Sequence, residues 1–111
     1  MLRLALSLLL ASLSISSVSS SSACPHGIRL RKEVRDLSNT EWSAFAKAVK
    51  QLQSGPSPTP YDAIVKIHVD NQAAVHGYPL FFPWHRYYVL VFEQHLQAID
   101  PSIMVPYWDW G

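Results

Sequence analysis

The fold of this chain is decided by one stretch, His76-Gly-Tyr-Pro-Leu-Phe81-Phe-Pro83-Trp84-His85-Arg86-Tyr-Tyr-Val89-Leu-Val-Phe92-Glu93. Within it, His76 lies in a segment rich in glycine and proline, and His85 follows nine residues later at the start of an apolar run. A third histidine, His68, lies eight residues before His76, on what the pattern predicts to be the preceding helix. Two helices packed as an antiparallel pair can bring these imidazoles together, and three neutral imidazoles suit a copper or zinc ion.

Two helices are predicted before this stretch. Ser38 followed by Glu41 has the form of a capping box, and apolar residues then recur at helical spacing, which predicts a helix from about Asn39 to Gln53. A capping threonine, a proline in the first turn and an acidic residue after it predict a second helix from about Thr59 to Ala74. His68 falls on the apolar stripe of the second helix. That stripe also contains Tyr61, Ile64 and Val65.

A third helix is predicted from Pro83 to about Ile99, where an Asp-Pro pair ends it. It is apolar around most of its circumference, so it must be buried on several sides. The two preceding helices can cover only part of it. The sequence therefore predicts that this chain alone is poorly folded, aggregates, or dimerises through this surface. The side chains concerned are Leu90, Val91, Phe92 and Leu96.

The remaining polar and aromatic side chains are assigned to structure rather than chemistry. The basic segment 25–36 is expected to be an extended lead-in with solvated charges. Arg86 and Glu93 are too far apart along one helix to pair with each other, so each is expected to make a structural salt bridge. One aromatic set is expected to belong to the core rather than to a substrate platform. It consists of Trp84, Tyr87, Tyr88, Tyr107, Trp108 and Trp110.

Composition and the N-terminus limit the classes of protein that remain. The formal net charge of +1 offers no basic face for nucleic acid. Residues 1–23 combine an early arginine, a short apolar run and a serine-rich end, which predicts a secretory signal peptide and a secreted protein; the run is too short to span a membrane. Residues 24–111 then form one small domain. Its single cysteine, Cys24, pairs with a partner elsewhere or remains a free thiol.

The central motif also carries a resemblance. The order of its histidines, aromatic residues, arginine and glutamate resembles the first copper-site signature of the tyrosinase family, which includes catechol oxidases and molluscan haemocyanins. The closing Pro106-Tyr107-Trp108-Asp109-Trp110 is similar to the segment that follows this signature in short secreted tyrosinases. The positions that match the signature are His76, Phe81, Trp84, His85, Arg86 and Glu93.

The resemblance implies a mainly α-helical fold, the N-terminal half of an antiparallel four-helix bundle of the type-3 copper proteins. It implies that residues 24–111 are the part of the tyrosinase copper-binding domain that binds the first copper, through His68, His76 and His85. In that family a second copper is held by three later histidines, and the pair converts phenols or catechols to ortho-quinones with dioxygen. Only His95 follows His85 here, so the fragment alone is expected to be inactive and to need a missing C-terminal half.

Two other functions remain open at this point. An oxygen-carrying, haemocyanin-like or plain copper-binding module would share the fold. A three-histidine zinc hydrolase would need a general base, which the sequence does not nominate. Some family members cross-link a cysteine to a ligand histidine, but Ala74 stands at that position here. His26 and His95 are left out of the predicted site.

Overall fold

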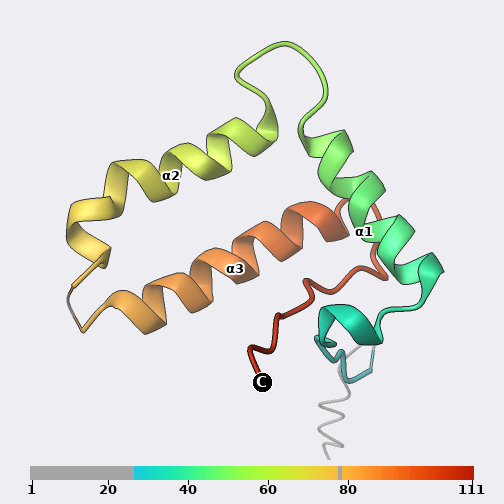
Figure 1. Cartoon of the computed structure of the whole chain (residues 1–111). Coiled ribbons are helices and arrows are strands. Elements are labelled where there is room, and N and C mark those ends of the chain that lie inside the picture. The colour runs from blue at the N-terminus through green and yellow to red at the C-terminus, as the bar shows by residue number, and fades with distance from the viewer. Residues whose placement is uncertain (1–26, 78) are drawn as a thin grey trace, which may run out of the picture.

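The computed structural model describes residues 27–77 and 79–111, which form a short 3-10 turn and three α-helices (Figure 1). No β-strand occurs within these two ranges, so the prediction of a mainly α-helical fold is confirmed. The predictions about the signal peptide, Cys24 and His26 concern residues outside the described part. The elements are η1 (Val34–Asp36), α1 (Asn39–Leu52), α2 (Pro60–Val75) and α3 (Phe81–Gln97).

Helix α1 begins as the sequence predicts. The Ser38 hydroxyl accepts a hydrogen bond from the Glu41 backbone N–H at 3.2 Å, and the Glu41 carboxylate accepts one from the Ser38 N–H at 2.9 Å. Helix α2 has the same reciprocal box, since the Asp62 carboxylate accepts from the Thr59 N–H at 2.7 Å while the Thr59 hydroxyl accepts from the Asp62 N–H. Both helices therefore start where their unpaired N–H groups find side-chain acceptors.

Helix α3 differs from its prediction at both ends. It begins at Phe81 rather than Pro83, with Leu80 as a cap that makes no side-chain hydrogen bond, and it ends at Gln97 rather than near Ile99. Proline at the third helical position is tolerated, because the first four N–H groups of a helix have no intrahelical acceptor anyway. Proline therefore marked the first turn of this helix but not its first residue.

A tight turn joins α2 to α3 and makes them an antiparallel pair, while α1 crosses near the other end of the pair (Figure 1). Gly77 directly follows His76, the C-cap residue of α2. Its φ is +76°, a backbone conformation that residues with L side chains rarely adopt. The chain can therefore reverse direction directly after His76. The core lies where the three helices meet, and its buried members are Ala48, Leu52, Ile64, Leu96 and Ile103.

The carboxylate of Glu93, on α3, ties two distant segments to this helix. Its side chain is buried and accepts hydrogen bonds from the Arg31 guanidinium at 2.8 and 3.1 Å and from the Val105 N–H at 2.9 Å. The structural salt bridge predicted for Glu93 is therefore confirmed, and the expectation of a solvated charge is wrong for Arg31. Arg86 has no acidic partner within 4 Å in the part of the chain that the structure describes, so its predicted ion pair is not found.

A backbone bridge holds the same two segments together. The Val34 N–H donates to the Tyr107 carbonyl, and the Tyr107 N–H donates to the Lys32 carbonyl, both at 2.9 Å. These two bonds form an isolated parallel bridge between Glu33 and Tyr107. The extended lead-in expected from the sequence thus forms backbone hydrogen bonds with the C-terminal segment at residues 32–34.

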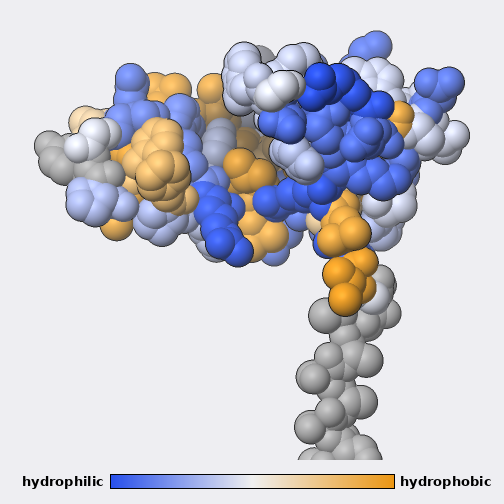
Figure 2. Space-filling view, turned by 60° about the horizontal axis from the view of Figure 1, so that its bottom comes forward, coloured by the Kyte–Doolittle hydropathy of each residue, from blue (hydrophilic) through white to orange (hydrophobic). Residues whose placement is uncertain are grey.

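Several large apolar side chains remain at the surface (Figure 2). The expectation that the aromatic set belongs to the core is wrong for Tyr87, Tyr107, Trp108 and Trp110, of which the last is 92% exposed. Val65, predicted on the buried stripe of α2, is also exposed. The remaining exposed large apolar residues of α2, α3 and the turn between them are Ile67, Val69, Leu80, Phe81, Phe82 and Leu90. In the described ranges, no helix has the length and apolar character needed to cross a bilayer.

The Glu93 ion pair predicts a pH-dependent stability. Burial raises the pKa of Glu93, but hydrogen bonds from Arg31 and Val105 and the nearby charges of Arg31 and Arg29 outweigh it, so the pKa is lowered below 4.5. Its contribution to stability is therefore present above the unfolded-state pKa and is lost as the pH falls through the folded value. In urea unfolding at pH 7, the free energy of unfolding of Glu93→Gln should be lower than that of the unmodified chain by about 1.5–3 kcal/mol, the usual contribution of hydrogen bonds to a charged group.

The difference in the free energy of unfolding between the unmodified chain and Glu93→Gln should narrow as the pH falls towards 3. Arg86→Gln serves as the matched control, because it removes a charge from the same helix without breaking an ion pair of the described structure. A stability gap for Glu93→Gln that stays constant down to pH 3 would contradict this role of the carboxylate.

The exposed apolar residues lead to a second prediction. A chain of residues 24–111 should bind a dye specific for apolar surface, or sediment as a dimer or larger species, because such patches favour association. Phe82→Ser should reduce the signal without lowering the free energy of unfolding, since Phe82 is 80% exposed. Leu96→Ala, in the core, is the contrasting variant and should cost about 2–5 kcal/mol. A monomer that binds no dye and unfolds cooperatively would be inconsistent with this prediction.

Candidate metal centre

The three histidines predicted as ligands converge at the end of the α2–α3 pair. His68 lies within α2, His76 is the cap that ends α2, and His85 lies in the second turn of α3. Their ring centroids are separated by 5.0–5.4 Å, and one nitrogen from each ring lies within 4.8 Å of the others. The fold thus brings all three together, and their role as metal ligands stays a prediction.

Two of the rings are oriented by backbone carbonyls. The Nδ1 atom of His76 lies 2.9 Å from the Gln72 carbonyl oxygen, and the Nδ1 atom of His85 lies 2.7 Å from the Phe81 carbonyl oxygen. Each carbonyl can only accept, so both Nδ1 atoms carry the proton. In a neutral imidazole the lone pair is then on Nε2. Metal-binding histidines are commonly fixed by such a bond from their second nitrogen.

The spacing of the nitrogens fits a metal ion. The Nε2 atoms of His68 and His85 are 3.3 Å apart. Two imidazole nitrogens bound to one ion at about 2.0–2.1 Å with a tetrahedral angle would be separated by about 3.3–3.4 Å. Three nitrogen donors with no carboxylate suit copper or zinc rather than calcium or magnesium. The group found within the described ranges contains only His68, His76 and His85, so it offers no carboxylate as a general base for hydrolysis.

Aromatic side chains surround the three imidazoles. The ring centroid of Phe81 lies 4.3 Å from that of His85. The ring centroids of Trp84 and Tyr88 lie 5.7 and 5.5 Å from that of His68. Burial is the largest cause that raises the pKa of Tyr88, followed by the charge of Tyr61, so the Tyr88 hydroxyl stays protonated. The site therefore has aromatic neighbours, while the side chains of His68 and His85 are only half-buried.

The other histidine of α3 lies outside this group. His95 is exposed in the last turn of the helix, nearly three turns beyond His85. It is not part of the group formed by His68, His76 and His85. Its exclusion from the ligand set stays a prediction.

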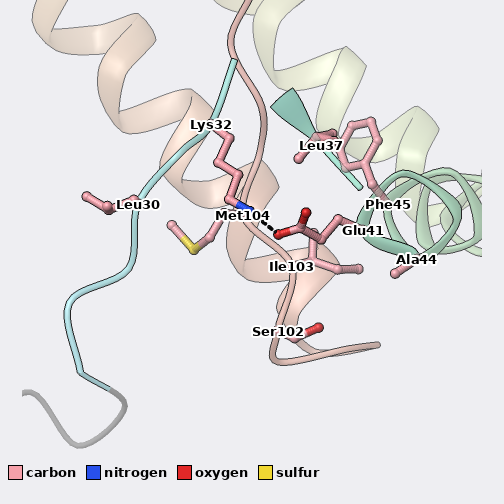
Figure 3. A pocket seen from close by; sticks show the side chains of 9 residues that line it. All are labelled: Leu30, Lys32, Leu37, Glu41, Ala44, Phe45, Ser102, Ile103 and Met104. Carbon is pink, nitrogen blue, oxygen red and sulfur yellow. Dashed lines mark hydrogen bonds and ion pairs between the residues drawn. The ribbon is translucent and has the colours of Figure 1, made fainter. Parts of the chain in front are cut away.

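A small hollow elsewhere in the molecule has a different character. It lies between the lead-in, the start of α1 and the segment after α3, and the Lys32 ammonium spans it to the Glu41 carboxylate at 2.6 Å (Figure 3). Hydrogen bonds from Lys32 and Ser38 lower the pKa of Glu41 to about 2. That carboxylate is already bound to the helix cap and the lysine, so this hollow serves to join segments and is not the candidate site.

Sequence reasoning missed the groups that orient the imidazoles. Gln72 and Phe81 precede His76 and His85 by four residues, the spacing at which a helical side chain lies near the preceding carbonyl. That spacing could have predicted the two Nδ1 contacts. The hydrogen bond from the Tyr88 hydroxyl to the Ile64 carbonyl oxygen, at 3.1 Å, carries no such local signal because it joins two helices.

Comparison with known proteins gives a consistent result. Residues 58–111 match the model of the common central domain of tyrosinase. Grixazone synthase of Streptomyces griseus subsp. griseus is 34% identical over 94 residues, which cover 75% of this chain and 30% of that protein. A tyrosinase of Streptomyces antibioticus is 37% identical over 90 residues, covering 74% and 32% respectively. The G-type hemocyanin of Enteroctopus dofleini is 37% identical over 92 residues, covering 73% and 3%. The chain thus spans about a third or less of these relatives.

Replacement of each histidine should separate ligands from bystanders. His68→Ala, His76→Ala and His85→Ala should each weaken copper binding by more than the roughly 10–100-fold loss typical of residues that only support a ligand. His95→Ala should bind copper as the unmodified chain does, because it lies outside the group. Isothermal titration with copper, with total copper checked by elemental analysis, makes the comparison. Equal losses for His95→Ala and His85→Ala would mean that the ligand set is wrong.

Proposed function

This chain belongs to the tyrosinase family, and we propose that it forms the first copper site of an oxidoreductase that converts phenols or catechols to ortho-quinones with dioxygen. The observation that supports the copper site is the convergence of His68, His76 and His85 within 4.8 Å on one helix pair. The activity itself is a proposal, since the chain spans only about a third of the tyrosinase and grixazone synthase that it matches.

The residues of this chain would hold and orient the metal. Copper, when bound, would supply the redox chemistry that couples loss of two electrons and two protons from each of two catechols to reduction of one dioxygen to two waters. With a phenol as substrate, one oxygen atom of dioxygen would enter the ring and the other would leave as water. His76 and His85 present their Nε2 lone pairs because their Nδ1–H groups donate to backbone carbonyls. Phe81 packs against the His85 ring and Trp84 against the His68 ring, which limits the movement of both imidazoles. A flat phenolic ring suits the open side of such an aromatic-walled site.

Turnover requires a second copper site in this proposal. The family resemblance implies three further histidines for it, and His95 is the one other histidine in the described ranges. We therefore propose that the second site is supplied by another segment or another chain. We also propose, from the N-terminal pattern of residues 1–23, that the protein is secreted, where dioxygen and small phenols would be its partners.

A complementation experiment tests the proposed function. The chain of residues 24–111, loaded with copper, should oxidise 4-methylcatechol negligibly by itself. Quinone formation should appear when the chain is fused to the C-terminal portion of the Streptomyces antibioticus tyrosinase that follows the matched segment. The fusion carrying His85→Ala should be inactive, and the fusion carrying His95→Ala should be active. Absorbance of the quinone and oxygen consumption provide the two readouts.

The outcomes separate the alternatives. Reversible dioxygen uptake by the fusion without quinone formation would favour a carrier related to the haemocyanins over an oxidase. Rapid catechol oxidation by the isolated monomer would contradict the need for a second site. Copper-free chain that hydrolyses esters after zinc is added would favour the hydrolase instead.

A further inference from the structure

The three candidate ligands are not oriented in the same way. His76 and His85 are each held by a hydrogen bond from Nδ1 to the backbone carbonyl four residues earlier. For the Nδ1 atom of His68, no hydrogen-bond partner is found among the residues that the structure describes. Its Nε2 atom faces the Nε2 atom of His85 at 3.3 Å. A ring without a hydrogen bond at its second nitrogen needs another constraint to hold its plane.

Two aromatic side chains of α3 supply that constraint. The rings of Trp84 and Tyr88 are stacked on each other, with centroids 5.1 Å apart and planes at 12°. The His68 imidazole packs against both, with centroids at 5.7 and 5.5 Å and planes inclined by 36° and 31°. Trp84 and Tyr88 are four residues apart, so one face of α3 presents both rings. Together they restrict the orientation of the imidazole.

Tyr88 also fixes the helical turn that carries His68. Its hydroxyl donates a hydrogen bond to the Ile64 carbonyl oxygen at 3.1 Å. In an α-helix this carbonyl is the one that accepts the backbone N–H of His68, four residues later. The hydroxyl of Tyr88 therefore binds α3 to α2 at the turn that sets the position of the His68 backbone. One side chain thus constrains both the ring of His68 and the turn beneath it.

We propose that Trp84 and Tyr88 are positioning residues that hold His68 in the orientation needed to bind copper, in place of the carbonyl contacts that hold His76 and His85. This inference rests on the proposed copper site and deepens it. The stacked rings of Trp84 and Tyr88 fix the plane of the His68 imidazole. The Tyr88 hydroxyl fixes the position of the α2 turn that carries His68 relative to α3. Neither residue belongs to the group of three candidate ligands.

Copper titration of the full chain tests this role through a double-mutant cycle. Tyr88→Leu removes the ring and the hydroxyl, and it should weaken copper binding about 10–100-fold, the usual effect of losing a group that orients a ligand. Tyr88→Phe keeps the ring and should recover most of that loss. Trp84→Phe should likewise bind more tightly than Trp84→Leu. Tyr87→Leu is the matched control, because Tyr87 neighbours Tyr88 but is 67% exposed, and its affinity should equal that of the unmodified chain.

The decisive comparison uses His68→Ala as the background. If Tyr88 acts through His68, Tyr88→Leu should cause no further loss of affinity once His68 is absent. Electron paramagnetic resonance of the Cu(II) form should show one fewer coordinated nitrogen in Tyr88→Leu than in Tyr88→Phe. Circular dichroism confirms that helix content is retained. If Tyr88→Leu does not fold, Trp84→Leu takes its place in the cycle with His68→Ala. Tyr88→Phe and Trp84→Phe then serve as the variants that keep an aromatic ring.

The outcomes distinguish this inference from the copper site itself. An unmodified chain that binds no copper would overturn the proposed site and the positioning role together. Copper binding by the unmodified chain with unchanged affinity in Tyr88→Leu and Trp84→Leu would overturn the positioning role alone. Equal losses for Tyr88→Leu in the presence and absence of His68 would show a general effect on the fold, and would likewise overturn it.

Discussion

A neutral imidazole can bind a metal through one nitrogen only when the other carries the proton, and this requirement shapes the α2–α3 pair. His76 and His85 meet it with the backbone carbonyls of Gln72 and Phe81, which a helix places at the right distance without any further side chain. The packing of α3 against α2 then has to bring a third ring to within 3.3 Å of His85. The turn after His76 and the aromatic residues of α3 both serve that approach.

The remainder of the described structure holds α3 in place from the opposite end. Glu93 accepts bonds from the lead-in and from the segment after α3, so two pieces of extended chain are fastened to the helix that carries His85. Leu96, the most completely buried residue, lies one turn further along the same helix. Leu96 therefore lies towards the opposite end of α3 from the candidate site. Tyr88 packs against the core and connects it to the site, through its hydrogen bond to Ile64 and its contact with His68.

The sequence predicted those features whose causes are local. The capping box of α1, the threonine cap of α2, the three helices and the grouping of His68, His76 and His85 follow from spacing within a few turns. What it missed depends on contacts between distant segments. Arg31 looked like one solvated charge among several, because nothing near it in sequence indicates Glu93. The aromatic residues near the C-terminus looked like core, because their exposure depends on which surfaces lie beside them rather than on their hydrophobicity.

The left-handed turn at Gly77 has a consequence for the order of assembly. It keeps all three histidines within the 18 residues from His68 to His85, so the entropy lost in closing the chain around the site is small. The Arg31–Glu93 contact, by contrast, joins residues 62 positions apart. Contacts of short sequence separation form fastest. We therefore expect the α2–α3 hairpin that carries the three histidines to be the earliest organised part of this chain, a local unit on which the more distant segments later close.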